Sequence, residues 1–334
     1  MTQTATLISM GLAEPDNIVY TKDLAERMGV DPKWAERVTG IHSRRHTTVE
    51  GVNDEGIRLA KASLDQALQR ADLKINDLDV IICASAVPSQ AIPATAPLLQ
   101  AAYGEEAAGI PAFDINATCI SFVTAFDLMA NMISLGKYQR VGIVSTDLPS
   151  LSLNFDEPKN ALLFGDGSAA AILGVDDNQA VHVLANKMAT YGSGAHDTEI
   201  RGGGSAIPPK VYAQQPKTDF MFHMDGQATF RLAMRKVPDF VDELLQEAGL
   251  DLKDIDMVVP HQASGLAMKI MKKHLGIPDD KFYSIIEDHG NMVSASIPTT
   301  LAMAIDRGDI KRGDKVLLIG TAAGLTMQGL IFEY

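Results

Sequence analysis

One helix–strand unit occurs twice along this chain, and this repeat limits what the chain can fold into. Residues 64–82 (LDQALQRADLKINDLDVII) align without a gap with residues 241–259 (VDELLQEAGLDLKDIDMVV). The identical pairs are Asp65/Asp242, Leu68/Leu245, Gln69/Gln246, Ala71/Ala248, Leu73/Leu250, Asp77/Asp254 and Asp79/Asp256. Two unrelated amphipathic units can also look alike, but the alignment favours a duplicated α/β half.

The hydrophobic pattern around the repeat predicts the architecture. We expect strands at 79–85, 140–146, 256–262 and 315–321, and helices at 56–73 and 233–250. Near-continuous apolar strands suit a parallel sheet that helices cover on both faces. We therefore predict an α/β fold of two βαβαβ halves, residues 1–174 and 175–334, packed as a five-layer αβαβα sandwich. The halves would join near 169–177, and a cleft between them would draw residues from both.

Charge and composition exclude several functions. The net charge of −13 argues against general nucleic-acid binding, which requires a basic face. No apolar run approaches the roughly 20 residues of a membrane span, and the N-terminus lacks the features of a signal peptide. The two cysteines are far apart, as is typical of reduced thiols. We expect a cytoplasmic protein that binds neither membranes nor nucleic acids.

One of the two cysteines begins an apolar segment. Residues 119–136 (CISFVTAFDLMANMISLG) predict a buried helix that ends at Gly136. Cys119 would lie in its first turn, where free amides and the helix dipole favour a thiolate. A lone cysteine is more often an inert core residue, and Cys83, within a predicted strand, is expected to be one.

Two further polar residues follow in suggestive places. His261 lies just past the end of a predicted parallel strand, where ligands bind in open α/β sheets. Asn291 follows Gly290 in a turn before a helix of small residues, 294–306, although such an asparagine is often only a turn residue. Together with Cys119 they form a set of candidate catalytic residues.

This set of residues is compatible with more than one chemistry. Cysteine, histidine and asparagine in this order also occur in papain-like proteases. The chain lacks the Cys-Gly-Ser-Cys-Trp signature of those enzymes, and a duplicated α/β pattern does not suit their fold. A metal site is not expected, because the eight histidines are scattered and the cysteines lack ligand spacing.

Longer motifs identify a family resemblance over essentially the whole chain. The sequence resembles β-ketoacyl-acyl-carrier-protein synthase III, a family of the thiolase superfamily. The supporting motifs are DINATCISF (114–122), VVPHQA (258–263), GNMVSASIP (290–298), FGDGSAAAIL (164–173) and WAERVTGIHSRR (34–45). The resemblance implies a thiolase-like fold, whose duplicated halves agree with the repeat, and a homodimer.

The resemblance also implies a reaction. An acyl group would be loaded on Cys119 as a thioester, and a malonyl thioester would lose CO₂ to give an enolate that attacks it in a Claisen condensation. His261 and Asn291 would donate hydrogen bonds to the enolate oxygen. The amides of Cys119 and Gly324 would form a second oxyanion hole for acyl transfer. The product would be a β-ketoacyl thioester of fatty acid or secondary-metabolite biosynthesis.

Other positions would bind the substrates, which are acyl-coenzyme A or acyl-carrier-protein thioesters, with no further cofactor. Trp34 matches the aromatic residue that packs on the coenzyme A nucleotide, and Phe164 and Ser264 are expected to contact substrate. Ile92 matches a position, often Phe, that reaches across the dimer and closes the acyl pocket. Because Ile is smaller, the resemblance implies a pocket deeper than one built for acetyl.

An acidic carrier protein would need a basic patch on this acidic chain. The candidates are Arg231, Arg235, Lys236, Lys269, Lys272 and Lys273. Charged runs of this kind are also typical of ordinary solvated helix faces.

Three departures from the family pattern leave the substrates open. Leu266 and Val38 stand where the family commonly has arginines, with Arg37 one place off, and Ala322–Ala323–Gly324 replaces a glycine triplet. These changes suggest a specialised relative. Two alternatives remain: a non-decarboxylating condensation or acyl transfer to oxygen or nitrogen on the same fold, and a non-catalytic partner subunit or acyl-binding module.

Overall fold

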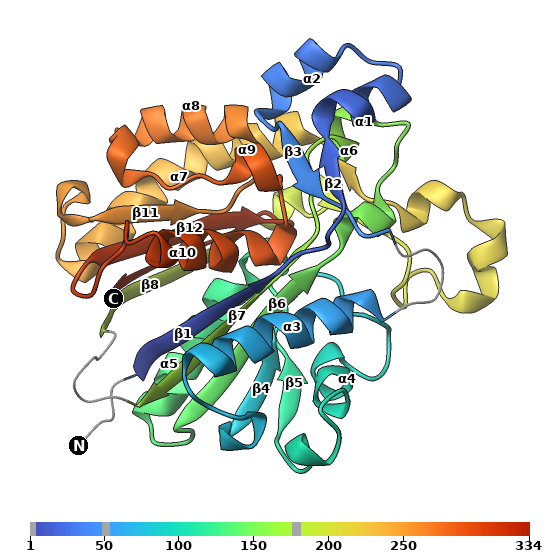
Figure 1. Cartoon of the computed structure of the whole chain (residues 1–334). Helices are drawn as coiled ribbons and strands as arrows, with labels where there is room; N and C mark the ends of the chain where they lie inside the picture. The colour runs from blue at the N-terminus through green and yellow to red at the C-terminus, as the bar shows by residue number, and fades with distance from the viewer. Residues whose placement is uncertain (1–4, 49–53, 176–181) are drawn as a thin grey trace.

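The computed structural model describes residues 5–48, 54–175 and 182–334. Its two large mixed β-sheets form two separate layers (Figure 1). The first sheet has the order β1 (Ala5–Ala13), β7 (Gly167–Val175), β6 (Arg140–Asp147), β4 (Val80–Cys83) and β5 (Ala112–Asp114). The second has the order β11 (Met257–Pro260), β12 (Lys315–Ala322), β13 (Thr326–Glu333) and β8 (His182–Thr190). The first sheet therefore ends at Val175 and the second begins at His182.

The four strands predicted from the sequence are present and pair as expected. β4 runs parallel to β6, and β11 runs parallel to β12. The remaining strands make each sheet mixed, because β7 is antiparallel to β6 and β13 is antiparallel to β12. The connection between β12 and β13 is too short for a parallel crossover. The predicted strands therefore form the parallel part of each sheet, to which antiparallel strands are added.

Helices cover both sheets and fill the space between them. α3 (Glu55–Arg70) and α4 (Thr95–Ala101) cover the outer face of the first sheet, and α7 (Gly226–Ala248) covers that of the second, with α8 (Gly265–Leu275) packed against it. α5 (Ser121–Ser134) and α10 (Ser296–Asp306) lie between the sheets. α5 is apolar on most sides because a sheet covers each of its flanks. This arrangement confirms the predicted five-layer sandwich.

The repeated aspartates make the same contacts in both halves. The side chain of Asp77 accepts the amide of Lys74 at 2.8 Å, and that of Asp254 accepts the amide of Asp251 at 2.9 Å. Asp79 accepts the Arg140 amide at 2.9 Å, and its counterpart Asp256 accepts the Lys315 amide at 2.8 Å. Each pair of aspartates therefore caps a turn and fixes the start of the neighbouring strand.

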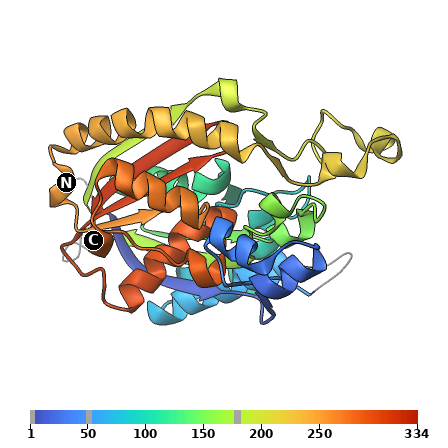
Figure 2. The ribbon, with the colours of Figure 1, turned by 90° about the horizontal axis from the view of Figure 1, so that it is seen from above.

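Smaller elements surround one end of the sandwich. They are β2 (Ile18–Tyr20), α1 (Thr21–Arg27), α2 (Pro32–Thr39), β3 (Ser43–Arg45), α6 (Pro158–Ala161), β9 (Thr198–Glu199), β10 (His223–Met224) and α9 (Ile286–His289). The segment between β9 and β10 projects from the body in the view from above (Figure 2). Within the described ranges, no helix combines the length and the hydropathy that crossing a bilayer would need.

Candidate active site

Cys119, His261 and Asn291 line one cavity of about 2690 Å³. Cys119 lies in a 3₁₀ turn, Thr118–Ile120, rather than in the first turn of α5, which begins at Ser121. His261 follows the end of β11, and Asn291 lies between α9 and α10. The structure therefore brings to one cavity a residue from the first half and two from the second.

Gly320 on β12 allows these elements to approach closely. A Cβ atom built there would lie 2.9 Å from Cβ of His261 and 3.0 Å from Cγ2 of Ile120. Real Cβ atoms essentially never come so close to other heavy atoms, so only glycine fits without a shift of its neighbours. His261 and the turn that carries Cys119 therefore contact the same point of the second sheet.

Replacing Gly320 by alanine should destabilise the fold and disturb the site, because the methyl group would displace His261 or Ile120. We expect a loss of about 1–3 kcal/mol in the free energy of unfolding, measured by denaturant titration, together with reduced turnover. Gly192→Ala is a matched control, since no atom lies within 4 Å of its added Cβ. Equal stability of the two variants would contradict this packing.

The carboxamide of Asn291 is held in one orientation. Its Oδ1 accepts the amide of Val293 at 2.9 Å, while its Nδ2 lies a distant 3.4 Å from the Ala263 carbonyl. Val293 has φ 51°, a conformation that costs energy in a β-branched residue and that is common at functional sites. With Oδ1 engaged, the NH₂ group is the end that can donate to a ligand in the cavity.

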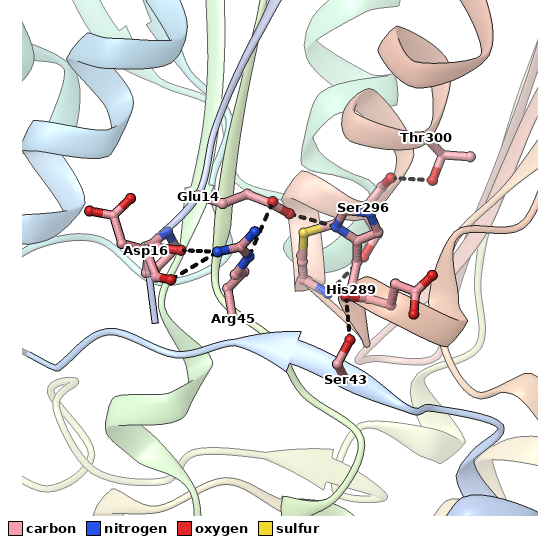
Figure 3. Close-up of polar contacts among 10 residues, drawn as sticks. Glu14, Asp16, Ser43, Arg45, His289, Ser296 and Thr300 are labelled. Atoms are coloured by element: carbon pink, nitrogen blue, oxygen red, sulfur yellow. Dashed lines mark hydrogen bonds and ion pairs between the residues drawn. The ribbon is translucent and has the colours of Figure 1, made fainter. Parts of the chain in front are cut away.

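Backbone bonds and a half-buried polar cluster anchor the segment that carries Asn291. The Asn291 amide donates to the Leu163 carbonyl at 2.8 Å, and the Asn291 carbonyl accepts from the Gly165 amide at 3.0 Å. Two residues earlier, His289 Nδ1 lies 2.6 Å from Glu14, whose carboxylate also contacts Arg45 at 3.8 Å (Figure 3). Segments from three parts of the chain therefore fix the position of this turn.

His261 is buried and neutral. Burial lowers the pKa of its imidazole to about 4. The backbone amide of His261 donates to the Ile319 carbonyl at 2.8 Å, while Nδ1 is enclosed and has no hydrogen-bond partner within the described residues. Nε2 is thus the ring nitrogen left for a ligand. At neutral pH this side chain can donate a hydrogen bond without carrying a charge.

The thiol of Cys119 is not activated as a thiolate, contrary to the expectation from helix position. Burial and the nearby charge of Asp147 raise its pKa to about 12, although the backbone amides of Cys119 and Ala323 act in the opposite direction. The free thiol is therefore protonated at neutral pH, and its proton must leave as the sulfur attacks.

The amide that approaches the sulfur from the second half belongs to Ala323 rather than to Gly324. The Ala323 amide favours the ionised sulfur, and Ala323 lines the cavity, whereas Gly324 does not. Gly324 instead turns the chain from β12 into β13 with φ 138°, which a residue with a side chain rarely adopts. The oxyanion role expected of the Gly324 amide stays a prediction, and the Ala323 amide is a second candidate for it.

Asp147, at the end of β6, is a buried carboxylate that the sequence reasoning missed. It accepts the amides of Ala86, Val87 and Ser294, each at 3.1 Å, and the hydroxyl of Ser294. Burial raises its pKa to about 6 in spite of these donors. Asp147 thus ties the first half to the turn after Asn291. The strand-end rule that singled out His261 would also have found it.

Removing the charge of Asp147 should make Cys119 more acidic, because that charge disfavours the thiolate. For Asp147→Asn we expect the pH profile of alkylation by iodoacetamide to shift to lower pH, with faster alkylation at neutral pH. Asp166→Asn is the control, since Asp166 is equally buried and bonded to Thr47 and Ser150 but does not line the cavity. Identical profiles would refute the electrostatic link.

The predicted substrate residues divide into two groups. Trp34, Phe164 and Ser264 all line the cavity, and the Phe164 ring packs edge-on against Phe222 at 4.7 Å. Ile92 does not line the cavity of its own chain and is 86% exposed. Val38 and Leu266, which stand in place of arginines, also line the cavity, so they leave that part of its wall apolar.

The basic residues differ in how freely they can meet a partner. Arg231 and Arg235 on α7, and Lys269 and Lys273 on α8, are exposed. The other two are engaged within the chain. Lys236 lies 4.8 Å from the Tyr191 ring centre, and Lys272 forms an ion pair with Asp279.

Comparisons with known proteins identify the family to which the chain is similar. The family model for 3-oxoacyl-[acyl-carrier-protein (ACP)] synthase III matches residues 113–192, and the model for its C-terminal part matches residues 245–334. The β-ketoacyl-[acyl-carrier-protein] synthase III of Syntrophomonas wolfei is 30% identical over 98% of this chain and 97% of its own. The protein of the same name from Neisseria gonorrhoeae is 31% identical over 99% of this chain and 100% of its own. The crystal structure of the 3-oxoacyl-[acyl-carrier-protein] synthase III of Aquifex aeolicus is 29% identical, with a TM-score of 0.88, and the match covers 99% of this chain and 100% of that one.

Proposed function

Since this chain belongs to the β-ketoacyl-[acyl-carrier-protein] synthase III family, we propose that it is an acyltransferase that makes a β-ketoacyl thioester by decarboxylative Claisen condensation. The observation that carries the proposal is the convergence of Cys119, His261 and Asn291 on one cavity, where the Asn291 NH₂ group makes only a long contact with the Ala263 carbonyl and has a second hydrogen to donate. The reaction belongs to fatty acid or secondary-metabolite synthesis, and we place it in the cytoplasm.

In the first half-reaction, Cys119 takes the acyl group. The sulfur loses its proton and attacks the thioester carbonyl, an S–C bond forms, and the thiol of the donor leaves with the proton. Burial raises the pKa of the Cys119 thiol, so its proton has to be lost on the way to the S–C bond. The amide of Cys119, together with that of Gly324 or Ala323, stabilises the oxygen of the tetrahedral intermediate.

In the second half-reaction, a malonyl thioester loses CO₂ and its electron pair becomes an enolate. His261 and Asn291 donate hydrogen bonds to the enolate oxygen. A neutral imidazole suits this role because it can donate from Nε2 without protonating the carbon. The enolate carbon attacks the acyl group, a C–C bond forms, and the Cys119 sulfur leaves and regains a proton.

Isotope release and intact mass test the reaction together. We expect the mass of the protein to increase by one acyl group after incubation with an acyl thioester. Labelled malonyl thioester should then release labelled CO₂ in proportion to the β-ketoacyl product. Product without CO₂ release would favour a non-decarboxylating condensation, and no loading with any thioester would favour a binding module or partner subunit.

We further propose a homodimer in which Ile92 of each subunit closes the acyl pocket of the other. The exposed apolar side chains of Ile92, Val87 and Phe113, the last on the edge strand β5, support a contact on this side. We expect acyl groups longer than acetyl to load efficiently, and Ile92→Phe to reduce long-chain but not acetyl loading. Strict preference of the unmodified protein for acetyl would count against this proposal.

Coenzyme A or an acyl carrier protein would deliver the acyl groups, with no other cofactor. The half-buried ring of Trp34 at the cavity supports nucleotide packing, and the exposed Arg231, Arg235, Lys269 and Lys273 support contact with an acidic carrier. Lys236 and Lys272 would contribute less, because both already have partners within the chain.

A further inference from the structure

The cavity extends away from Cys119 into the core of the second half. On α7 it is lined by Phe230, Ala233, Val237 and Phe240, which follow one face of the helix at spacings of three and four residues. On α8 the residues Ala267, Met271 and Leu275 form a matching stripe, and on the sheet Val258, Ile319 and Met327 complete the lining. We call this space, between α7, α8 and the second sheet, the second-half arm.

The second-half arm is apolar, and several of the side chains that line it are buried. Every residue that α7 contributes from Ala233 onward is apolar, and Phe240 and Met327 are 2% and 1% exposed. From Phe230 to Phe240 the helix rises about 15 Å, which is long enough for an extended alkyl chain. Packed cores rarely contain voids larger than a water molecule, and such voids cost stability. A bound chain would fill this one.

The second-half arm opens beside the side chains that would hold the enolate. It does not open on the first-half side of the cavity, where Ile92 lies. Pro260 ends β11 just before His261, and its partner Ile319 on β12 directly precedes Gly320. The opposite side of the cavity, formed by 86–91 and α4, is the side from which Ile92 would meet a partner subunit. The cavity thus offers separate space for the acyl group on Cys119 and for a substituent of the enolate.

We infer that the second-half arm binds an unbranched alkyl chain on the α-carbon of the extender, so that the substrate class is 2-alkylmalonyl thioesters. This inference rests on the proposed function. Loss of CO₂ from a 2-alkylmalonyl thioester leaves the electron pair on the substituted carbon, with the oxygen held by His261 and Asn291. Attack on the acyl-Cys119 thioester then forms the C–C bond and releases an α-alkyl-β-ketoacyl product.

Competition between two extenders tests the inference. The protein with acylated Cys119 is given malonyl and 2-hexylmalonyl thioesters, and both β-keto products are quantified by mass spectrometry. We expect both products from the unmodified protein. Product from malonyl alone would overturn the inference and leave the proposed function intact, whereas no product from either extender would overturn the proposed function.

Filling the arm supplies the matched variants. Ala233→Phe should reduce the ratio of 2-hexylmalonyl to malonyl product at least tenfold, and Ala233→Val should reduce it less, in proportion to the space filled. Ala213→Phe, at an exposed position that does not line the cavity, should leave the ratio unchanged. If Ala233→Phe fails to fold, the smaller Ala233→Val substitution still tests whether the alkyl chain occupies the arm. An unchanged ratio in Ala233→Val with 2-dodecylmalonyl thioester would refute occupation of the arm.

Discussion

Cys119→Ala should abolish covalent loading and reduce β-ketoacyl formation to background, a loss of roughly 10³-fold or more. The sulfur is the only nucleophile proposed for the acyl group, and the side chain lies where the amides of Cys119 and Ala323 converge. Intact-mass measurement after incubation with an acyl thioester checks the loading, and chromatography of the β-keto product checks the condensation.

The same variant separates the two half-reactions. His261 and Asn291 remain in place when Cys119 is replaced, so malonyl thioester should still lose CO₂ slowly in Cys119→Ala. Cys83→Ala is the matched control, because this buried thiol belongs to the core between α3 and the first sheet and should not be acylated. An acylated Cys119→Ala protein would disprove the assignment of the nucleophile.

Asn291→Asp should leave acyl loading nearly unchanged and slow condensation by about 10²–10³-fold, the usual effect of losing one oxyanion donor. The substitution is close to isosteric, and one carboxylate oxygen can still accept the Val293 amide. The other oxygen would face the enolate with a negative charge instead of an N–H donor. Single-turnover measurement of loading and of condensation distinguishes the two steps.

Asn291→Ser offers a graded comparison, since a hydroxyl can donate but reaches less far. We expect its condensation rate to lie between those of the unmodified protein and Asn291→Asp. Thermal unfolding of each variant shows whether the turn keeps its anchors to Leu163 and Gly165. Equal slowing of loading and condensation in a fully folded Asn291→Asp protein would contradict a role confined to the enolate.

The sequence was sufficient to predict the layers and the three converging side chains. The repeat implied two equivalent halves, and the strand-end position of His261 placed it at the cleft, because parallel strands present their carboxyl ends at one edge. The long motifs around Cys119 and Asn291 supplied the rest. These features are local in the chain, or follow from topology alone.

What the sequence did not reveal depends on contacts between distant segments. The ionisation of Cys119 is set by burial and by Asp147, which lies on another strand. The approach of the Ala323 amide to the sulfur depends on how the chain turns after β12. The start of α5 after Cys119 likewise depends on the preceding 3₁₀ turn, which residue propensities do not predict.

The central layer has a consequence for how this enzyme can change over generations. α5 and α10 pack against each other between the two sheets, and their side chains belong to one continuous core drawn from both repeats. One repeat therefore cannot be exchanged or redesigned without regard to the side chains of the other. A substitution that changes side-chain volume in α5 limits which side chains fit at the facing positions of α10, and the reverse also holds. We therefore expect substitutions in the two helices to be coupled.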